Sequence, residues 1–245
     1  MIDPSLLGGA LGGRFTAFSH GGAVTEAPLP PGRHGLAFEE GREAVLVVPE
    51  GLDTTSPVPL MVLFHGAGGE ANRMLPYFVR WARSRGFLLL APQSMFPTWD
   101  IVIGGHGPDL ERLESALTRV AARFPLDPSR LAFAGFSDGG SYALSTGVTN
   151  GDVASHVIAL SAGFMNAFTM FGTPRVFIAH GRSDRQLPIE TSAVAHARRL
   201  LDTHELTLLP FDGDHVIVPW VVERAVDFFL GPHLGQAPNA SPGRP

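Results

Sequence analysis

Residues 131–140, Leu-Ala-Phe-Ala-Gly-Phe-Ser-Asp-Gly-Gly, join a short apolar run to a glycine-rich turn centred on Ser137. An unbroken apolar run of this length is typical of a strand that is buried on both faces, as in a parallel sheet. The small residues from Asp138 to about Thr146 predict a helix immediately after it. With 29 glycines in the chain, the pattern Gly-x-Ser-x-Gly could be an ordinary turn. Its position between a strand and a helix instead favours a nucleophile elbow, which would hold Ser137 at the carboxyl edge of a sheet.

The same pattern of buried strands and amphipathic helices continues on both sides of this segment. Further strands are predicted at residues 60–64, 87–91, 157–160, 176–179 and 206–209, and helices at residues 71–85, 109–123, 189–202 and 217–229. Residues 36–38 and 44–48 flank a turn at Gly41-Arg42 and predict an antiparallel hairpin. Strands that alternate with helices through short links favour one doubly wound α/β domain, with helices on both faces of its sheet.

The two ends of the chain differ in composition from this region. Residues 1–33 are rich in Gly, Ala and Pro without a clear period, and we expect an irregular lead-in there. Residues 231–245 return to Pro, Gly, Asn and Ser and predict a flexible tail. The α/β domain is therefore expected to occupy residues 34–230.

The composition of the 245-residue chain excludes several kinds of chemistry. There is no cysteine and no lysine, so that all 18 basic residues are arginine. Thiolate nucleophiles, cysteine-bound zinc, Schiff-base lysines and the P-loop are thereby ruled out. The net charge of -5 and the absence of a basic cluster argue against a nucleic-acid partner.

The start of the chain carries no recognisable targeting signal. Residues 1–9 lack a basic region, and glycines interrupt their apolar run. No apolar stretch approaches the roughly 20 residues that a membrane-spanning helix needs. We therefore expect no membrane span and a cytoplasmic location, unless a leader has been removed.

A serine hydroxyl needs a base that takes its proton, and His215 is the best placed of the ten histidines. It follows the last predicted strand, so it should reach the same sheet edge as Ser137. Asp184, which follows the strand at 176–179, is the best candidate for the carboxylate that orients the imidazole. Asp212 and Asp214 are alternatives, but their closeness to His215 in sequence favours a role in turn formation. The chain order Ser137, Asp184, His215 is that of an α/β-hydrolase triad.

A second glycine-rich loop, His65-Gly66-Ala67-Gly68-Gly69, follows the strand at 60–64. Such a loop can direct a backbone N–H toward an oxyanion. We expect the N–H groups of Ala67 and Asp138 to form the oxyanion hole, with Gly66 as an alternative to Ala67. The His65 ring is expected to brace the loop, and the Asp138 side chain to have a structural role.

Together, these motifs resemble the α/β-hydrolase superfamily, and within it the small carboxylesterase/phospholipase and dienelactone-hydrolase-like enzymes. The segment around Ser137 also looks like that of polyhydroxyalkanoate-depolymerase-like esterases. The resemblance covers residues 36–230 and implies a mostly parallel sheet of about eight strands, a Ser-Asp-His triad, an acyl-enzyme mechanism, and neither metal nor cofactor. Dienelactone hydrolases proper use a cysteine nucleophile, which this chain lacks. Leu187-Pro188, after the Asp184 loop, is compatible with the phospholipase-like branch.

Substrate-binding candidates lie in the loops at the same sheet edge. Only residues 161–174 separate two predicted strands where lids usually enter this fold, which leaves no room for a large cap domain. Phe164 in this loop is expected either to pack over the sheet edge or to form a wall of an acyl pocket. Trp99 is expected on the leaving-group side. Gly66, Leu187 and Val216 complete the predicted substrate-binding set.

The function predicted from these residues is serine-dependent cleavage of a carboxylic ester, either small or polymeric. A thioesterase, a peptidase or an acyltransferase would use the same triad, and pocket shape distinguishes them. A non-catalytic binding module with this fold is the alternative from another class. Such modules usually lack a triad member, whereas here all three are present. The sequence does not indicate an oligomeric state.

Overall fold

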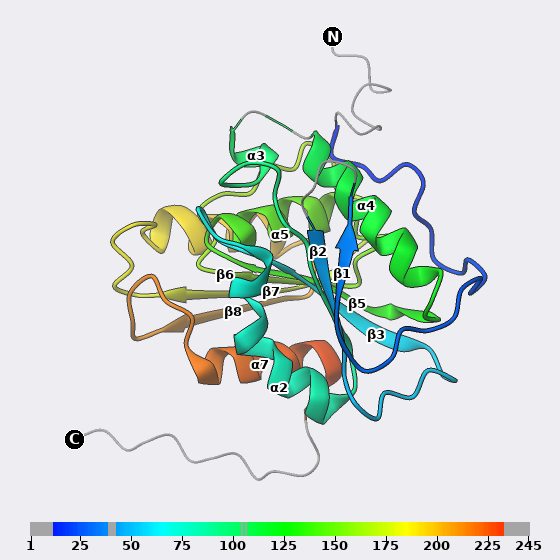
Figure 1. Cartoon of the computed structure of the whole chain (residues 1–245). Helices are drawn as coiled ribbons and strands as arrows, with labels where there is room; N and C mark the ends of the chain where they lie inside the picture. The colour runs from blue at the N-terminus through cyan, green and yellow to red at the C-terminus, as the bar shows by residue number, and fades with distance from the viewer. Residues whose placement is uncertain (1–11, 39–42, 104, 106, 233–245) are drawn as a thin grey trace.

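The computed structural model describes residues 12–38, 43–103, 105 and 107–232, and within them eight strands form one sheet (Figure 1). The strand order is β1-β2-β4-β3-β5-β6-β7-β8. The strands are β1 (Gly32–Ala37), β2 (Glu43–Val48), β3 (Val58–Phe64), β4 (Leu88–Ala91), β5 (Leu126–Phe136), β6 (His156–Leu160), β7 (Arg175–Gly181) and β8 (Leu206–Phe211). Strand β2 is antiparallel to both β1 and β4, and all other neighbours are parallel.

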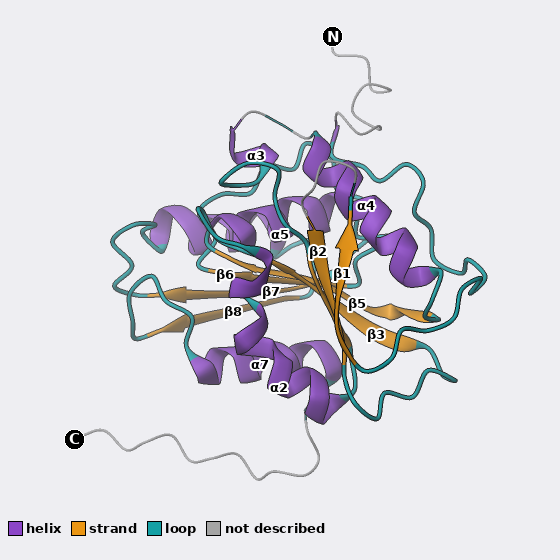
Figure 2. Cartoon of the chain, in the orientation of Figure 1, coloured by secondary structure: helices purple, strands orange, loops and turns teal. Residues whose placement is uncertain are grey.

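Helices cover both faces of the sheet, as Figure 2 shows. The helices α2 (Leu75–Arg85) and α7 (Pro219–Leu230) cover one face, and α4 (Pro108–Ala121), α5 (Asp138–Thr149) and α6 (Ala195–Leu200) the other. Short helical turns occur at Ala71–Arg73, Asp100–Ile103 (α3) and Glu190–Val194, the last of them π-helical. The mostly parallel, two-faced α/β sheet predicted from the sequence is confirmed.

The alternation of side chains along each strand explains why residues 157–160 of β6 are all apolar. In β6, Val157 and Ala159 pack with the α5 and α6 side, whereas Ile158 and Leu160 pack with the α7 side. All five residues of β6 are buried. All of them except His156 are apolar, and a run of consecutive apolar residues is the pattern that predicted a strand covered on both faces.

Three elements differ from the sequence prediction. The helix predicted at 71–85 is divided into a 3₁₀ turn at Ala71–Arg73 and α2. Strand β5 begins at Leu126 rather than at Leu131, and its pairing with β3 shifts register between Val58 and Leu60. At this irregularity the carboxylate of Asp127 accepts the Ser129 N–H at 2.9 Å, so polar residues lie within a strand. The helix predicted at 189–202 begins instead with the π-helical turn. The turn at Gly41-Arg42 lies outside the described residues, but the hairpin pairing of β1 with β2 is present.

Part of the segment that precedes β1 packs on the domain. Phe15 and Phe18 are buried in the core beside α4 and α5. The Arg14 guanidinium forms an ion pair with Asp152 at 2.6 Å, and the Phe15 N–H donates to the Asn150 side chain at 2.9 Å. Residues 12–31 are therefore irregular in conformation yet attached to the core.

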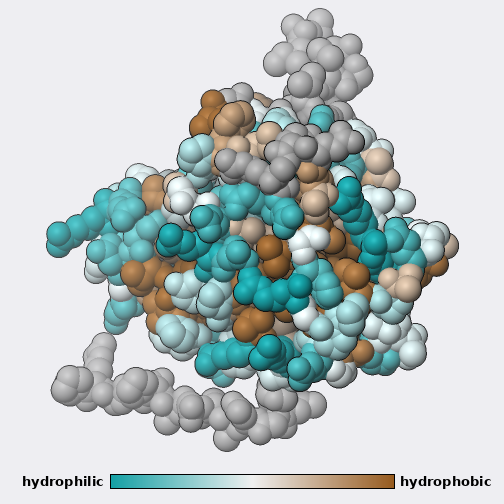
Figure 3. All heavy atoms as spheres, viewed as in Figure 1, coloured by the Kyte–Doolittle hydropathy of each residue, from teal (hydrophilic) through white to brown (hydrophobic). Residues whose placement is uncertain are grey.

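The face shown in Figure 3 is mostly polar, with apolar patches between polar side chains. Between β6 and β7, residues 161–174 contain no helix, so the fold has no large cap at this connection. Among the helices in the described part of the chain, none is long and apolar enough to cross a bilayer.

Candidate active site

The predicted catalytic residues all follow the carboxyl ends of parallel strands. Ser137 follows β5, Asp184 follows β7 and His215 follows β8. Because these strands are parallel neighbours or near neighbours, their ends meet along one edge of the sheet. The glycine loop at 65–69 follows β3, which pairs directly with β5.

Ser137 occupies a backbone conformation that only a tight turn imposes on a residue with a side chain. Its φ of 57° and ψ of -122° lie outside the regions that such residues normally adopt. A conformation of this kind costs about 1–3 kcal/mol, and the surrounding structure must hold it in place.

Glycines on both sides of Ser137 make this turn possible. A Cβ atom at Gly139 would lie 2.2 Å from the Phe64 carbonyl oxygen, and one at Gly135 would lie 2.1 Å from the Gly139 carbonyl oxygen. The strand β5, the helix α5 and the end of β3 therefore approach more closely than any side chain permits. This requirement is the physical basis of the Gly-x-Ser-x-Gly pattern.

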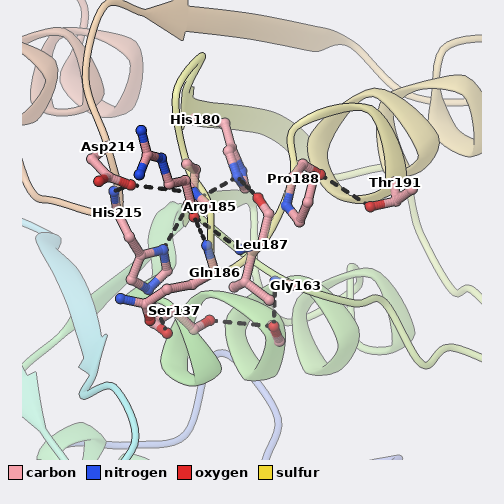
Figure 4. Close-up of polar contacts among 12 residues, drawn as sticks. Ser137, Gly163, His180, Arg185, Gln186, Leu187, Pro188, Thr191, Asp214 and His215 are labelled. Atoms are coloured by element: carbon pink, nitrogen blue, oxygen red, sulfur yellow. Dashed lines mark hydrogen bonds and ion pairs between the residues drawn. The ribbon is translucent and has the colours of Figure 1, made fainter.

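His215 joins the serine to the carboxylate. Its Nδ1–H donates to Asp184 Oδ2 at 2.7 Å, and its Nε2 accepts the Ser137 hydroxyl at 2.9 Å. The imidazole packs against the Phe136 ring, with 4.8 Å between the ring centroids. Figure 4 shows the His215 ring lying between the Asp184 loop and Ser137. The structure therefore brings the three predicted residues into hydrogen-bond contact, with His215 between Ser137 and Asp184.

The Asp184 carboxylate is fully buried and held by its own loop. Its Oδ1 accepts the N–H groups of Gln186 at 3.0 Å and Leu187 at 2.8 Å. Burial alone would raise the pKa of Asp184, but the hydrogen bonds from the Leu187 N–H and from His215 outweigh it, so that this pKa lies below its usual value. Asp184 is therefore an anion that can stabilise an imidazolium.

A second buried histidine, His180, adjoins the same carboxylate and was not singled out from the sequence. Its Nε2–H donates to the Leu187 carbonyl at 2.7 Å and lies 3.2 Å from Asp184 Oδ2. The pattern His180-Gly181 at the end of β7 was the available signal. The ring fixes both ends of the turn that presents Asp184 (Figure 4).

Of the two alternative carboxylates, Asp214 has the turn-forming role expected of it, whereas Asp212 takes part in an exposed ion pair. Asp214 accepts the backbone N–H of His215 at 2.9 Å and that of Arg185 at 3.3 Å, and so closes a turn. Asp212 is fully exposed and lies 3.7 Å from the Arg182 guanidinium. Neither carboxylate bonds the imidazole of His215.

The glycine loop lies against the catalytic serine. A Cβ atom at Gly66 would lie 3.5 Å from Cβ of Ser137. The N–H groups of Ala67 and Asp138 donate to no other described residue, so both are free to bind an oxyanion. Asp138 is also the first residue of α5, where backbone N–H groups have no helical partner.

His65 is buried and braces this loop, as predicted. Its Nδ1–H donates to the Gly66 carbonyl at 2.8 Å, and its Nε2 accepts the Ser94 N–H at 3.2 Å. A hollow of about 540 Å³ adjoins the outer side of the loop and is lined by Gly68, Gly69 and polar side chains that include Gln93 and Glu70.

The predicted substrate-binding residues differ in how far their side chains are buried. Leu187 is half-buried and would contact a Cβ atom placed at Gly163 at 2.9 Å, whereas Val216, which follows His215, is exposed. Phe164 is half-buried and packs against the core. Trp99 differs from the expectation: only 1% of it is exposed, because its ring lies beneath the glycine loop. A side chain in that position supports the site rather than lining an open surface.

The connection between β6 and β7 is fastened to the elbow helix. The Ser141 hydroxyl accepts the N–H groups of Gly163 at 2.9 Å and Phe164 at 3.3 Å. The Ser145 hydroxyl accepts the Asn166 N–H at 2.8 Å. These hydrogen bonds fix residues 163–166 against α5.

Comparison with curated proteins finds fungal relatives of low identity. The chain is 26% identical to a probable feruloyl esterase C from Aspergillus terreus over 165 residues, which are 64% of this chain and 60% of the relative. It is 24% identical to feruloyl esterase C from Emericella nidulans over 186 residues, 73% of this chain and 68% of the relative. The chain thus spans about three fifths of the length of the first of these relatives. No family model matches the chain.

Comparison with solved structures identifies the fold. Esterase 2 from Thermogutta terrifontis, phosphorylated by paraoxon, superposes with a TM-score of 0.68 at 18% identity. The superposition covers 83% of this chain and 97% of that esterase. A ferulic acid esterase from Anaeromyces mucronatus gives a TM-score of 0.59 at 16% identity. That superposition covers 82% of this chain and 89% of the esterase. The strand order of the sheet, the turn at Ser137 and these superpositions all indicate the same fold. The chain therefore has the α/β-hydrolase fold, with Ser137, Asp184 and His215 at its carboxyl edge in the order typical of that fold.

Proposed function

We propose that this protein is a serine hydrolase that cleaves carboxylic esters through an acyl-enzyme intermediate. One observation carries the proposal: His215 bridges the Ser137 hydroxyl at 2.9 Å and the buried Asp184 carboxylate at 2.7 Å, on an elbow that exposes the serine. Because the buried carboxylate accepts the Nδ1 proton, Nε2 is the nitrogen that is left to take the proton of Ser137.

The steps follow from this geometry. Ser137 Oγ attacks the ester carbonyl carbon while its proton passes to His215 Nε2. The carbonyl oxygen becomes an oxyanion beside the N–H groups of Ala67 and Asp138. His215 then returns the proton to the leaving alkoxide, and the acyl group remains on Ser137. A water molecule, deprotonated by His215, attacks the acyl carbon and releases the carboxylic acid and free serine.

For the acyl group we propose an aromatic acid of the hydroxycinnamate kind. The support is that the curated relatives are named feruloyl esterases. The half-buried apolar side chain of Leu187, in the loop that presents Asp184, suits such a ring. The substrate is then a small or polymeric ester rather than a nucleic acid, which the net charge of -5 disfavours.

A substrate panel tests this proposal. It comprises nitrophenyl esters of rising acyl length, methyl ferulate, an acyl thioester and a polyester film, with Ser137→Ala as the inactive reference. We expect kcat/KM to be highest for methyl ferulate, and Ser137→Ala to hydrolyse none. A preference for short-chain acyl groups would overturn the aromatic acyl group. Turnover of the thioester alone would replace the assignment with a thioesterase. A folded protein that turns over nothing in the panel would favour the binding module.

A further inference from the structure

Three consecutive residues between β4 and α3 each bond to a wall of the oxyanion hole. The Pro97 carbonyl accepts the Gly68 N–H at 2.6 Å, in the glycine loop. The Thr98 hydroxyl donates to Asp138 Oδ2 at 2.6 Å, on the elbow helix. The Trp99 indole N–H donates to the His65 carbonyl at 2.7 Å. Residues 97–99, the clamp segment, thus contact both chain segments that supply the oxyanion N–H groups.

The clamp segment is itself held firmly. Trp99 is buried, stacks on Tyr142 with 4.6 Å between ring centroids, and meets the edge of Phe64 at 5.2 Å. The buried Asp109 carboxylate accepts the Met95 N–H at 2.7 Å. It also accepts the N–H of residue 100 at 2.8 Å, so the segment is fixed on both sides. A loop anchored in this way provides a rigid reference for whatever it bonds.

The two oxyanion donors come from different elements, and their spacing must be set. The N–H of Ala67 belongs to the loop after β3, and that of Asp138 to the first turn of α5. Oxyanion donors act at about 2.7–3.1 Å, so a shift of a few tenths of an ångström in either one weakens the stabilisation. Within the described residues, the hydroxyl of Thr98 is the side-chain donor to Asp138, at the residue that carries one of these N–H groups.

We propose that the clamp segment positions both oxyanion donors, and that Thr98 is a positioning residue for the N–H of Asp138. The inference rests on the proposed ester hydrolysis and adds to it a residue that acts through another. The hydrogen bond of the Thr98 hydroxyl goes to the carboxylate of Asp138, and none to Ser137 or His215 is present among the described residues. Its loss should therefore weaken transition-state stabilisation and leave substrate binding unchanged.

The test is a set of variants that remove or keep this one hydrogen bond. Thr98→Val keeps the shape and removes the hydroxyl, whereas Thr98→Ser keeps the hydroxyl. For Thr98→Val we expect kcat to fall about tenfold with KM within about twofold, and Thr98→Ser to stay within about twofold of wild type. A trifluoromethyl ketone, which forms an oxyanion on the serine, should bind Thr98→Val more weakly by the same factor as the loss of kcat.

A matched control is Thr55→Val. The Thr55 hydroxyl donates to Asp53 Oδ1, also at 2.6 Å, in an exposed turn before β3. The Thr55→Val variant therefore removes the same type of hydrogen bond far from the clamp segment. Its kcat and its affinity for the ketone should equal those of wild type.

Asp138→Ala tests the same bond from its other end. It removes the acceptor of the Thr98 hydroxyl, keeps the backbone N–H, and should resemble Thr98→Val. Combining Thr98→Val with Asp138→Ala should cause no further loss, because both remove one interaction. Asp138→Ala alone decides the matter if Thr98→Val does not fold.

Two results separate this inference from the proposed function. If the wild-type protein turns over no ester, the proposed function fails and this inference with it. If wild type is active and the folded Thr98→Val keeps its kcat and its ketone affinity, only the clamp assignment is overturned. Additive losses in the double variant would overturn it as well.

Discussion

The Asp184 carboxylate lies 2.7 Å from His215 Nδ1, although 31 positions separate the two residues in the sequence. The contact depends on β7 and β8 being parallel neighbours, which places the loops after them side by side. Because the other carboxylate oxygen is occupied by two backbone N–H groups of its own loop, the oxygen that faces His215 cannot turn away.

The first prediction concerns the negative charge of the Asp184 carboxylate. Asp184→Asn should lower kcat by about 10³–10⁴, because an amide neither stabilises the imidazolium nor fixes the tautomer with its proton on Nδ1. Steady-state hydrolysis of a nitrophenyl ester measures the loss. Asp214→Asn is the control, since the Asp214 carboxylate bonds only backbone N–H groups. Equal losses in the two variants would contradict the assignment of Asp184.

The second prediction concerns the close approach at the elbow. Gly139→Ala would place a Cβ atom 2.2 Å from the Phe64 carbonyl oxygen and 2.5 Å from that of His65, both of which are backbone atoms. We expect a loss of about 3 kcal/mol or more in the free energy of unfolding, measured by urea denaturation. Gly22→Ala, where nothing lies within 4 Å, should change it by less than about 0.5 kcal/mol. A stable Gly139→Ala protein would mean that the elbow is looser than described.

The third prediction concerns pH and stability. Burial, with a further contribution from Arg175, lowers the pKa of His156 from 6.5 to about 4. Between these values the unfolded chain binds a proton that the folded chain does not, so stability falls as pH drops from about 6.5 to 4. After allowance for solvent screening, the loss should be about 2 kcal/mol.

The control for this prediction is a variant that cannot titrate at the same position. Burial raises the pKa of Asp109 to about 6, so Asp109 acts in the opposite direction, favouring the fold at low pH. The measurement is therefore the difference between wild type and His156→Gln in urea denaturation at pH 7 and pH 4.5. The wild type should lose more stability than the variant across this range. Parallel curves for the two proteins would contradict the shift.

Much of the site could be predicted from sequence because its placement depends on local patterns. The apolar runs that end near Phe64, Phe136 and Ala179 mark strands covered on both faces, and parallel strands bring their following loops to one edge. The glycines around Ser137 encode a close backbone approach that leaves a readable spacing. Order along the chain then selects Asp184 and His215 for the triad.

The residues that support the site could not be found in this way. Trp99 was expected beside the substrate and lies buried beneath the glycine loop, because the packing of Tyr142 and Phe64 decides where its ring sits. Thr98 and His180 show no periodic pattern in the sequence. Thr98 bonds Asp138, which is 40 positions away, and His180 bonds the Leu187 carbonyl across a turn. Such contacts are set by tertiary packing, which a single sequence does not display.

The central claim is that Ser137 is the nucleophile. The most direct measurement is intact-protein and peptide mass spectrometry after reaction with a fluorophosphonate, comparing wild type, Ser137→Ala and the surface control Ser129→Ala. The account predicts one adduct on wild type and on Ser129→Ala, located at Ser137, and none on Ser137→Ala. An adduct that persists on Ser137→Ala, or a folded wild type that takes none, would contradict it.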